Sequence, residues 1–190
     1  MSKRREYHVR LVVFILLVVT RTLTAGEVQH ASVEYQAGIY SLSFEVVINA
    51  EFDTVRAIVT DYAKLDQLSD MVIKSTLLNM PDSENQRRLL VIRACLLVFC
   101  RNLKVVEDVV TAGPDQFVAT VVPESSDFKS GMTRWQLTRV DKQRTRIEFE
   151  GYEEPGFWIP PLLGPVLVKR RLLKEAMAVM NNIELLAKHD

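Results

Sequence analysis

The chain contains only two cysteines, Cys95 and Cys100, and they enclose the apolar residues LLVF at positions 96–99. A disulfide joins Cα atoms about 5.5 Å apart. Residues five apart in sequence lie about 16 Å apart in a strand. In a helix they lie about 7.5 Å apart along the axis and point to different sides. A disulfide therefore requires a hairpin with residues 96–99 as a four-residue loop. The alternative is a continuous strand with two free thiols.

The segment Leu96-Leu97-Val98-Phe99 is an unusual turn sequence, because it has none of the Gly, Asn, Asp or Pro residues that turns prefer. Either a disulfide holds this turn closed, or the apolar tip is itself required. We expect the disulfide between Cys95 and Cys100 to form.

Other residues that could do chemistry are few. The three histidines are His8, His30 and His189. Because they lie toward the ends of the chain, we predict neither a His-activated Ser or Cys nucleophile nor a His/Cys metal site. The sequence also lacks the glycine-rich phosphate-binding and dinucleotide-binding motifs. Catalysis by carboxylate or Arg and Tyr side chains stays an alternative, since Glu148, Glu150 and Arg93 fall in predicted strands, but alternation does not show which face they occupy. The sequence thus predicts no catalytic residue, no metal and no cofactor.

Residues 1–25 have the order of a secretory signal: a basic segment, the apolar run LVVFILLVVT, and the small-residue segment ending at Ala25. A membrane span needs about 20 apolar residues, and Arg21 ends this run earlier. We predict cleavage after Ala25 and export, to a bacterial periplasm; the alternative is an uncleaved membrane anchor. In an oxidising compartment, two nearby thiols tend to pair.

Five of the 24 basic residues and one of the 24 acidic residues lie within positions 1–25, so the remaining 165 residues carry a net charge of −4. A nucleic-acid-binding domain usually has a basic face, and we therefore expect no nucleic-acid partner. The length fits one domain that can bury a core, and we expect a monomer.

The hydrophobic pattern predicts an α+β domain. Residues 39–48 alternate as a half-buried strand, and residues 52–62 repeat at helical spacing, followed by a second short helical turn. The pattern then returns to a period of two, and a long helix closes the chain. The later predicted segments are strands at 72–78, 87–95, 101–110, 116–123, 132–140 and 144–152, and a helix at 161–187. Residues 26–38 are assigned as a lead-in.

This order resembles the helix-grip fold of the START-like (SRPBCC) superfamily, which contains polyketide cyclases/dehydrases, lipid-transfer domains and coenzyme-Q-binding proteins. The resemblance extends over residues 39–188 and rests on the order and spacing of four segments. They are VRAIVTDYAKL (55–65), SDFKSGMTRWQL (126–137), TRIEFEGYEEPGFWIPPLLGP (145–165) and NNIELLAK (181–188). It implies a curved antiparallel sheet of about seven strands around the long C-terminal helix, two short helices after the first strand, and an apolar cavity between sheet and helix.

The resemblance also implies which side chains meet a ligand, although each could equally be core filler. The candidates are Tyr62, Val91, Leu97, Phe99, Trp135, Leu137, Phe149, Lys169, Leu173, Met177 and Met180. Lys169 lies at the centre of the apolar face of the helix, so it must snorkel to solvent, pair with a carboxylate or meet the polar head of a ligand. The 96–99 tip would gate the cavity and touch a membrane surface transiently, or else pack into the protein's own core.

These expectations favour a protein that binds or transports a hydrophobic small molecule, such as a lipid, a quinone or a polyketide-like compound, without transforming it. A cyclase or dehydratase is the alternative, and it would need a buried acid or base with no protein partner. A third alternative is an interaction scaffold with a filled core.

Overall fold

The computed structural model describes residues 26–189 except for 80–84, 97–98 and 161–163, and at Leu96 and Phe99 it describes the backbone alone. The predicted signal peptide and most of the predicted turn at 80–86 lie outside these residues. The elements in chain order are β1 (Glu27–Gln36), β2 (Ile39–Ile48), α2 (Phe52–Thr60), η1 (Leu65–Gln67), β3 (Val72–Leu78), β4 (Gln86–Leu96), β5 (Phe99–Gly113), β6 (Gln116–Val121), η2 (Pro123–Ser125), β7 (Phe128–Arg139), β8 (Thr145–Pro155) and α3 (Gly164–Leu186).

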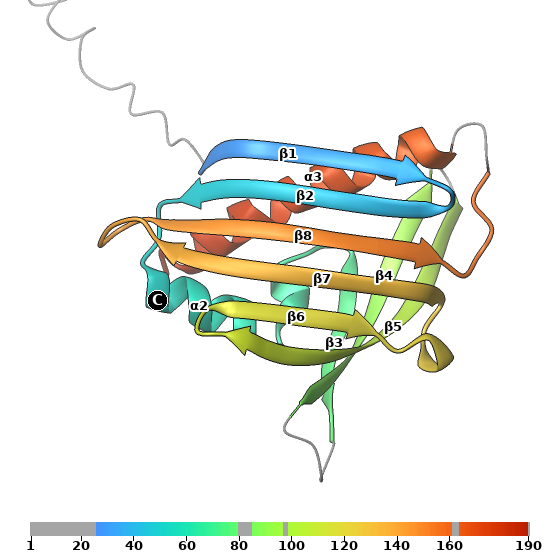
Figure 1. Ribbon diagram of the computed structural model, residues 1–190, viewed down its shortest axis with the longest axis horizontal. Coiled ribbons are helices and arrows are strands. Elements are labelled where there is room, and N and C mark those ends of the chain that lie inside the picture. The colour runs from blue at the N-terminus through green and yellow to red at the C-terminus, as the bar shows by residue number, and fades with distance from the viewer. Residues whose placement is uncertain (1–25, 80–84, 97–98, 161–163, 190) are drawn as a thin grey trace, which may run out of the picture.

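Eight antiparallel strands form one open sheet in the order β1-β2-β8-β7-β6-β5-β4-β3 (Figure 1). Strand β2 shows why the sheet has one buried face: Tyr40, Phe44 and Val46 are buried and alternate with more accessible residues. The β1–β2 hairpin closes through Ala37 and Gly38, which have φ values of 50° and 94°. Two positive φ angles are what a tight type I′ turn requires.

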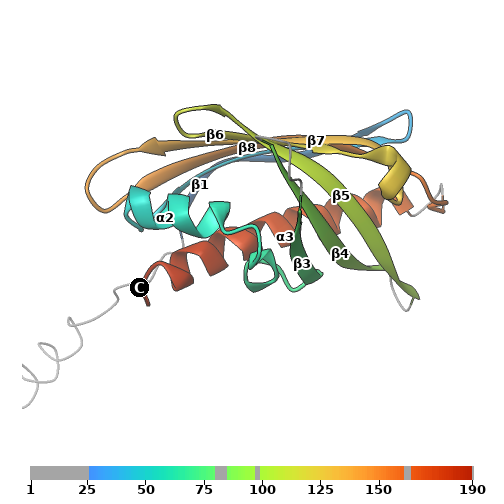
Figure 2. The same cartoon turned by 90° about the horizontal axis from the view of Figure 1, so that it is seen from below.

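Both α-helices lie on the same side of the sheet (Figure 2). Helix α3 runs along this face, and β3, β4 and β5 slope from the sheet toward the helix side. The sheet thus curves around α3, as the helix-grip prediction requires. Within the described residues, no helix has both the length and the apolar character needed to cross a bilayer.

The interior has two main apolar clusters. The larger joins β2, β7 and β8 to α2 and to the C-terminal half of α3, and its most buried members include Phe44, Ile48, Val55, Leu137, Ile147 and Ile183. The second lies under the curved end of the sheet and contains Leu90, Leu103, Val105, Val121 and Phe128. Since α3 extends beyond the larger cluster, its N-terminal half covers a less filled region.

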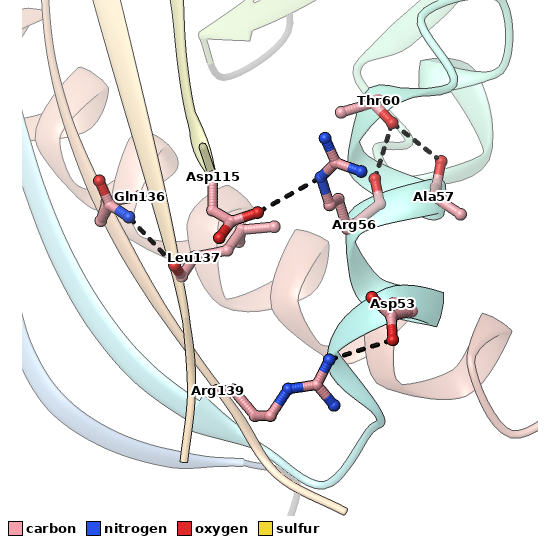
Figure 3. A network of polar contacts seen from close by, with 8 residues as sticks. All are labelled: Asp53, Arg56, Ala57, Thr60, Asp115, Gln136, Leu137 and Arg139. Atoms are coloured by element: carbon pink, nitrogen blue, oxygen red, sulfur yellow. Dashed lines mark hydrogen bonds and ion pairs between the residues drawn. The ribbon is translucent and has the colours of Figure 1, made fainter. Parts of the chain in front are cut away.

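Ion pairs fix helix α2 to the sheet at two positions, one in its first turn and one at its middle (Figure 3). Asp53 in its first turn pairs with Arg139 of β7 at 3.0 Å. Arg56 pairs with Asp115, in the β5–β6 turn, at 3.4 Å. The backbone N–H of Leu137 donates to the Asp115 carbonyl, which ties that turn to β7. These partly exposed pairs orient α2, whereas its buried apolar face provides most of the stabilisation.

The structure differs from the sequence prediction mainly at three points, besides shifts of one to three residues at the ends of other elements. The lead-in at 26–38 contains a strand, β1, which gives eight strands in place of about seven. The second predicted helix is a three-residue 3-10 turn, η1. Strand β7 begins at Phe128, four residues before its predicted start at 132.

The β4–β5 hairpin confirms the predicted disulfide. Cys95 and Cys100 are directly opposed in the ladder, their Cα atoms lie 4.0 Å apart, and their sulfurs are bonded at 2.05 Å. The predicted four-residue loop is wrong, because Leu96 and Phe99 also pair. The loop therefore shortens to residues 97 and 98, which lie outside the described residues.

Candidate functional site

A cavity of about 240 Å³ lies between the inner face of the sheet and the N-terminal half of α3. Strands β3 and β4 contribute Val72, Ile92 and Ala94 to its wall, and α3 contributes Val168 and Leu172. Its volume is just below the ~300–1,000 Å³ usual for drug-sized ligands. Two further hollows of about 590 Å³ are open surface depressions: polar residues border most of the first, and half of the residues that border the second are polar. The enclosed apolar space therefore belongs to the sheet–helix interface.

Glu153 is the carboxyl group in this cavity that the protein leaves unpaired. It lies on the inner face of β8, opposite Tyr40 of β2 in the ladder, and both side chains line the cavity. Within the described part of the chain, the Glu153 carboxyl has no hydrogen-bond or ion-pair partner. Burial raises its pKa to about 7, and the negative charge of Glu107 adds to the rise. Glu153 can therefore be neutral, and a hydrogen-bond donor, near neutral pH.

The Tyr40 hydroxyl is a second polar group at this wall. Tyr40 is 5% exposed, and burial raises the pKa of its hydroxyl, with a smaller contribution from Tyr35. Among the described residues, no partner lies within hydrogen-bonding distance of this hydroxyl. Tyr40 and Glu153 thus form a neighbouring hydroxyl–carboxyl pair that a ligand could complete.

The helix side of the cavity carries charges that the protein itself satisfies. Arg171 pairs with Glu175 one turn later, at 3.7 Å between Nη2 and Oε2. The other oxygen of Glu175 accepts a hydrogen bond from the Ser69 hydroxyl, which also accepts from the backbone N–H of Met71. Arg171 Nε lies 3.4 Å from the Met71 sulfur. This network fixes α3 to the segment before β3, and it leaves Glu153 and Tyr40 as the unpaired groups.

A buried ion pair lies next to the cavity. Arg88 of β4 and Glu107 of β5 pair at 2.7 Å, with 10% and 5% of their side chains exposed. The Arg88 guanidinium also lies 5.2 Å from the centre of the Tyr62 ring. The positive charge of Arg88 offsets the negative charge of Glu107. Ionisation of Glu153 would therefore add one uncompensated negative charge to this part of the interior.

Most of the predicted ligand-binding residues lie outside the cavity wall. Trp135, Leu137, Phe149, Met177 and Met180 belong to the larger apolar cluster. Trp135 and Phe149 pack edge to face, with ring centres 5.0 Å apart.

Two other predicted contacts, Tyr62 and Val91, also have different surroundings, whereas the side chains of Leu97 and Phe99 are not described. Tyr62 packs with Val109 and Ala119 in a small separate cluster. Val91 lies between the inward-facing Leu90 and Ile92, so strand alternation directs it to the opposite face. Leu97 lies outside the described residues, and only the backbone of Phe99 is described. Cys95, at the base of this hairpin, does line the cavity.

The cavity-facing stripe of α3 differs by one residue from the predicted one. Val168, Leu172 and Glu175 face the cavity, whereas Lys169 and Leu173 do not line it. One residue corresponds to about 100° of rotation around a helix. The stripe that faces the cavity contains the charged residues Arg171 and Glu175, so it does not look apolar in the sequence. The sequence prediction therefore centred the apolar face of the helix on Lys169.

The three catalytic alternatives lie on the outer face of the sheet. Glu148, Glu150 and Arg93 are all exposed. Sequence reasoning overlooked Glu153, although a signal was available. Ile147 and Phe149 face inward, and continuing their alternation along β8 also places Gly151 and Glu153 inward. No cluster of three or more potential metal-binding side chains occurs among the described residues.

The described architecture is shared with several solved structures. A START superfamily protein from Mycobacterium smegmatis has 17% identity and a TM-score of 0.62, covering 77% of this chain and 98% of that chain. The Zhui aromatase/cyclase from Streptomyces sp. R1128 has 12% identity and a TM-score of 0.62, covering 80% and 94%. A STAR-related lipid transfer protein from Xanthomonas axonopodis has 18% identity and a TM-score of 0.57, covering 83% and 98%. At these identities the similarity shows the fold.

Sequence comparison identifies the family. Comparison with curated proteins finds no match. The family described as polyketide cyclase/dehydrase and lipid transport matches residues 40–184, which include all but the first residue of β2, every strand from β3 to β8, and most of α3. The chain therefore belongs to the polyketide cyclase/dehydrase and lipid-transport family, and its fold is the START-like helix grip.

Proposed function

We propose that the protein binds a hydrophobic small molecule in the sheet–helix cavity and carries it without transforming it. The main support is the composition of the cavity, whose walls are apolar except for a few polar groups, of which Glu153 and Tyr40 are unpaired. Such a site suits a guest with an apolar body and one polar group. A lipid, a quinone or a polyketide-like compound has this character.

The apolar body would supply most of the affinity. Each Å² of apolar surface removed from water contributes about 25 cal/mol. The cavity of about 240 Å³ holds about eight groups the size of a water molecule, at ~30 Å³ each. A compact guest, or one segment of a longer one, fits this space. Neutral Glu153 and Tyr40 would orient it by donating hydrogen bonds to a carbonyl or hydroxyl oxygen.

We also propose that the protein acts after export, in a bacterial periplasm, and that the 96–99 tip gates the cavity at a membrane surface. The Cys95–Cys100 disulfide supports an oxidising compartment. Cys95 lines the cavity, so the base of the hairpin borders the proposed guest. Trp158 directly follows the cavity residue Phe157 and is 78% exposed, and exposed Trp side chains favour membrane interfaces.

Native mass spectrometry of protein purified from the periplasm, combined with solvent extraction, tests the binding proposal. We expect one apolar compound per chain. Leu172→Trp should abolish this occupancy, because the indole would fill the cavity. Leu185→Trp is the matched control on the same helix, where Leu185 is 54% exposed, and it should retain the compound. A parent protein that carries no stoichiometric apolar compound would contradict the proposal and favour the interaction scaffold.

Catalysis as a cyclase or dehydratase is the second candidate, and Glu153 is the observation that favours it. A carboxyl group with a pKa of about 7 is well matched to general acid–base catalysis at neutral pH. The reaction would be proton transfer to or from an aromatic or polyketide-like substrate, with Tyr40 as the neighbouring donor.

Incubation of the protein with a linear polyketide-like substrate, followed by mass spectrometry, separates the two candidates. A carrier leaves the mass unchanged. An acid–base enzyme releases water, and Glu153→Gln should then reduce turnover by about 10²–10⁴-fold while binding remains. Glu150→Gln, on the outer face of the same strand, is the control and should have no effect.

A further inference from the structure

The first described residue of the chain is bound to the last turns of its terminal helix. The backbone nitrogen of Gly26 donates a hydrogen bond to Oε2 of Glu184 in α3, at 2.9 Å. Glu184 is 3% exposed. A buried carboxylate is costly unless charged or hydrogen-bonding groups compensate it. The contact thus joins the two ends of the folded domain, and it does so at a buried carboxyl group that needs polar or charged partners.

The two oxygens of Glu184 have different partners. Oε1 accepts hydrogen bonds from Lys188 Nζ at 2.8 Å and from Asn49 Nδ2 at 3.5 Å, whereas Gly26 is the partner of Oε2. Burial alone would raise the pKa of the Glu184 carboxyl, but the hydrogen bonds from Lys188, Gly26 and Asn49 together lower it below its ordinary value. The site therefore holds an ionised carboxylate, and one of its two oxygens has no fully charged partner.

Gly26 is held in place by steric fit as well as by this hydrogen bond. A Cβ atom at position 26 would lie 2.6 Å from the carbonyl oxygen of Val47 and 2.9 Å from the side chain of Ile48. Real Cβ atoms do not approach backbone oxygens so closely, so only glycine fits here. The backbone nitrogen of residue 26 is thus fixed against both β2 and α3.

The predicted export signal ends at Ala25, directly before this fixed nitrogen. We propose that the Ala25–Gly26 peptide bond is a processing site, and that the α-ammonium group released on Gly26 forms an ion pair with the buried Glu184 carboxylate. Processing would then complete the folded domain. The pairing rests on the proposed export of the chain but requires no bound ligand.

The covalent step is hydrolysis by an endopeptidase of the class that removes export signals. One water molecule is consumed and the C–N bond between Ala25 and Gly26 breaks. The hydroxyl group passes to the Ala25 carbonyl carbon, giving a carboxylate on the released signal, and protons pass to the Gly26 nitrogen, giving an ammonium group. A neutral amide with one N–H becomes a cation with three, placed beside Oε2. Charge-assisted hydrogen bonds of this kind are about twice as strong as neutral ones.

The intact mass of the exported full-length gene product is the first test. We expect a chain that begins at Gly26. A mature chain that begins at any other residue, or a chain that keeps residues 1–25, overturns the proposal.

The second test measures how fast an anhydride acylates the α-amino group at pH 7. Peptide mass mapping follows the reaction at this group. Only the neutral amine reacts, and an unpaired α-amino group has a pKa of about 7.7–8.0. Pairing with Glu184 raises this pKa, so Glu184→Gln should accelerate acylation roughly tenfold. Lys188→Ala should slow it, because removing the competing cation strengthens the pairing. Glu34→Gln, an exposed residue on β1, should leave the rate unchanged.

The acylation rate is expected to rise in Glu184→Gln and to fall in Lys188→Ala. These opposite changes distinguish an ion pair from simple loosening of the terminus, which would accelerate acylation in both variants. Acylation of the parent protein should also lower its Tm by roughly 5 °C, and acylation of Glu184→Gln by less than half of that. Equal rates in the parent and Glu184→Gln, faster acylation of Lys188→Ala, or equal losses of Tm would each overturn the proposal. If Glu184→Gln does not fold, the Lys188→Ala rate still decides.

Discussion

Glu153 shows how strongly the interior of this fold changes the pKa of a carboxyl group. Its neighbours on the outer face of β8, Glu150 and Glu148, have the same side chain and are exposed, whereas Glu153 faces an apolar cavity and lacks a partner. Burial therefore raises the pKa of Glu153 to about 7. The same chemical group is exposed to solvent on one face of the strand, whereas on the other face it can be a neutral hydrogen-bond donor near physiological pH.

The free energy of unfolding of the ligand-free protein should fall as pH rises from 5 to 8. Because the folded-state pKa of Glu153 is raised, the folded state binds the proton more tightly than the unfolded state does. The contribution is fully present below the unfolded pKa and is lost as pH rises through about 7. We expect a loss of up to about 3 kcal/mol. Urea denaturation of the parent, Glu153→Gln and the control Glu150→Gln measures it, and a loss of the same size in Glu153→Gln would contradict the assignment.

At the scale of elements, the β4–β5 ladder carries two adjacent Arg–carboxylate pairs in different surroundings. Arg87 and Asp108 pair on the outer face at 2.6 Å, with side chains 29% and 37% exposed, whereas Arg88 and Glu107 pair in the interior. The Arg87 hydrogen bond lowers the pKa of Asp108, against a smaller opposing effect of burial. The ladder thus provides an internal comparison of exposed and buried ion pairs.

Arg88→Met should lower the free energy of unfolding by about 3–5 kcal/mol, because it leaves the Glu107 carboxylate buried without a charged partner. Arg87→Met, its neighbour in sequence, should cost no more than about 1 kcal/mol, since solvent screens the outer pair. Chemical denaturation at pH 7 compares the two variants. Similar costs would show that the Arg88–Glu107 pair is solvated in solution.

The predictability of each strand from the sequence followed the clarity of its apolar pattern. Strands β2 and β3 were predicted with the observed bounds, since apolar residues alternate along β2 and apolar pairs begin and end β3. Strand β1 was overlooked because its first residues are mostly polar, and because the alternation of Ala31, Val33 and Tyr35 in its later residues is short. The cavity depends on packing between α3 and β3–β5, which are far apart in sequence, and a charged pair on α3 concealed the stripe that faces it.

At the scale of the whole molecule, the curved sheet closes tightly on the C-terminal half of α3 and loosely on its N-terminal half. Ile183 is completely buried, whereas Val168 and Leu172 face the cavity. The domain thus combines a packed end that maintains the fold with a hollow end that can accept a guest. This division explains why most of the predicted contact residues with described side chains lie in the apolar clusters and not in the cavity wall.

Removal of the bound compound should lower the Tm of the parent protein and leave that of Leu172→Trp unchanged. A ligand that binds only the folded state stabilises it by RT ln(1 + [L]/Kd), or about 2.7 kcal/mol at one hundred times Kd. For a domain of this size, 1 kcal/mol corresponds to about 2–4 °C. Differential scanning calorimetry before and after delipidation measures the change. The same loss in Leu172→Trp would place the compound elsewhere.

The open sheet also determines how neighbouring molecules meet in a concentrated solution. Its two edges are β1 and β3, and unpaired edges invite strand addition. Glu27 and Glu34 place charges along β1, which disfavours such contacts. Strand β3 has only Lys74 as a charged residue, beside the exposed Ile73 and Leu77. Crowding should therefore drive self-association through β3, and an added lysine at position 77 should suppress it.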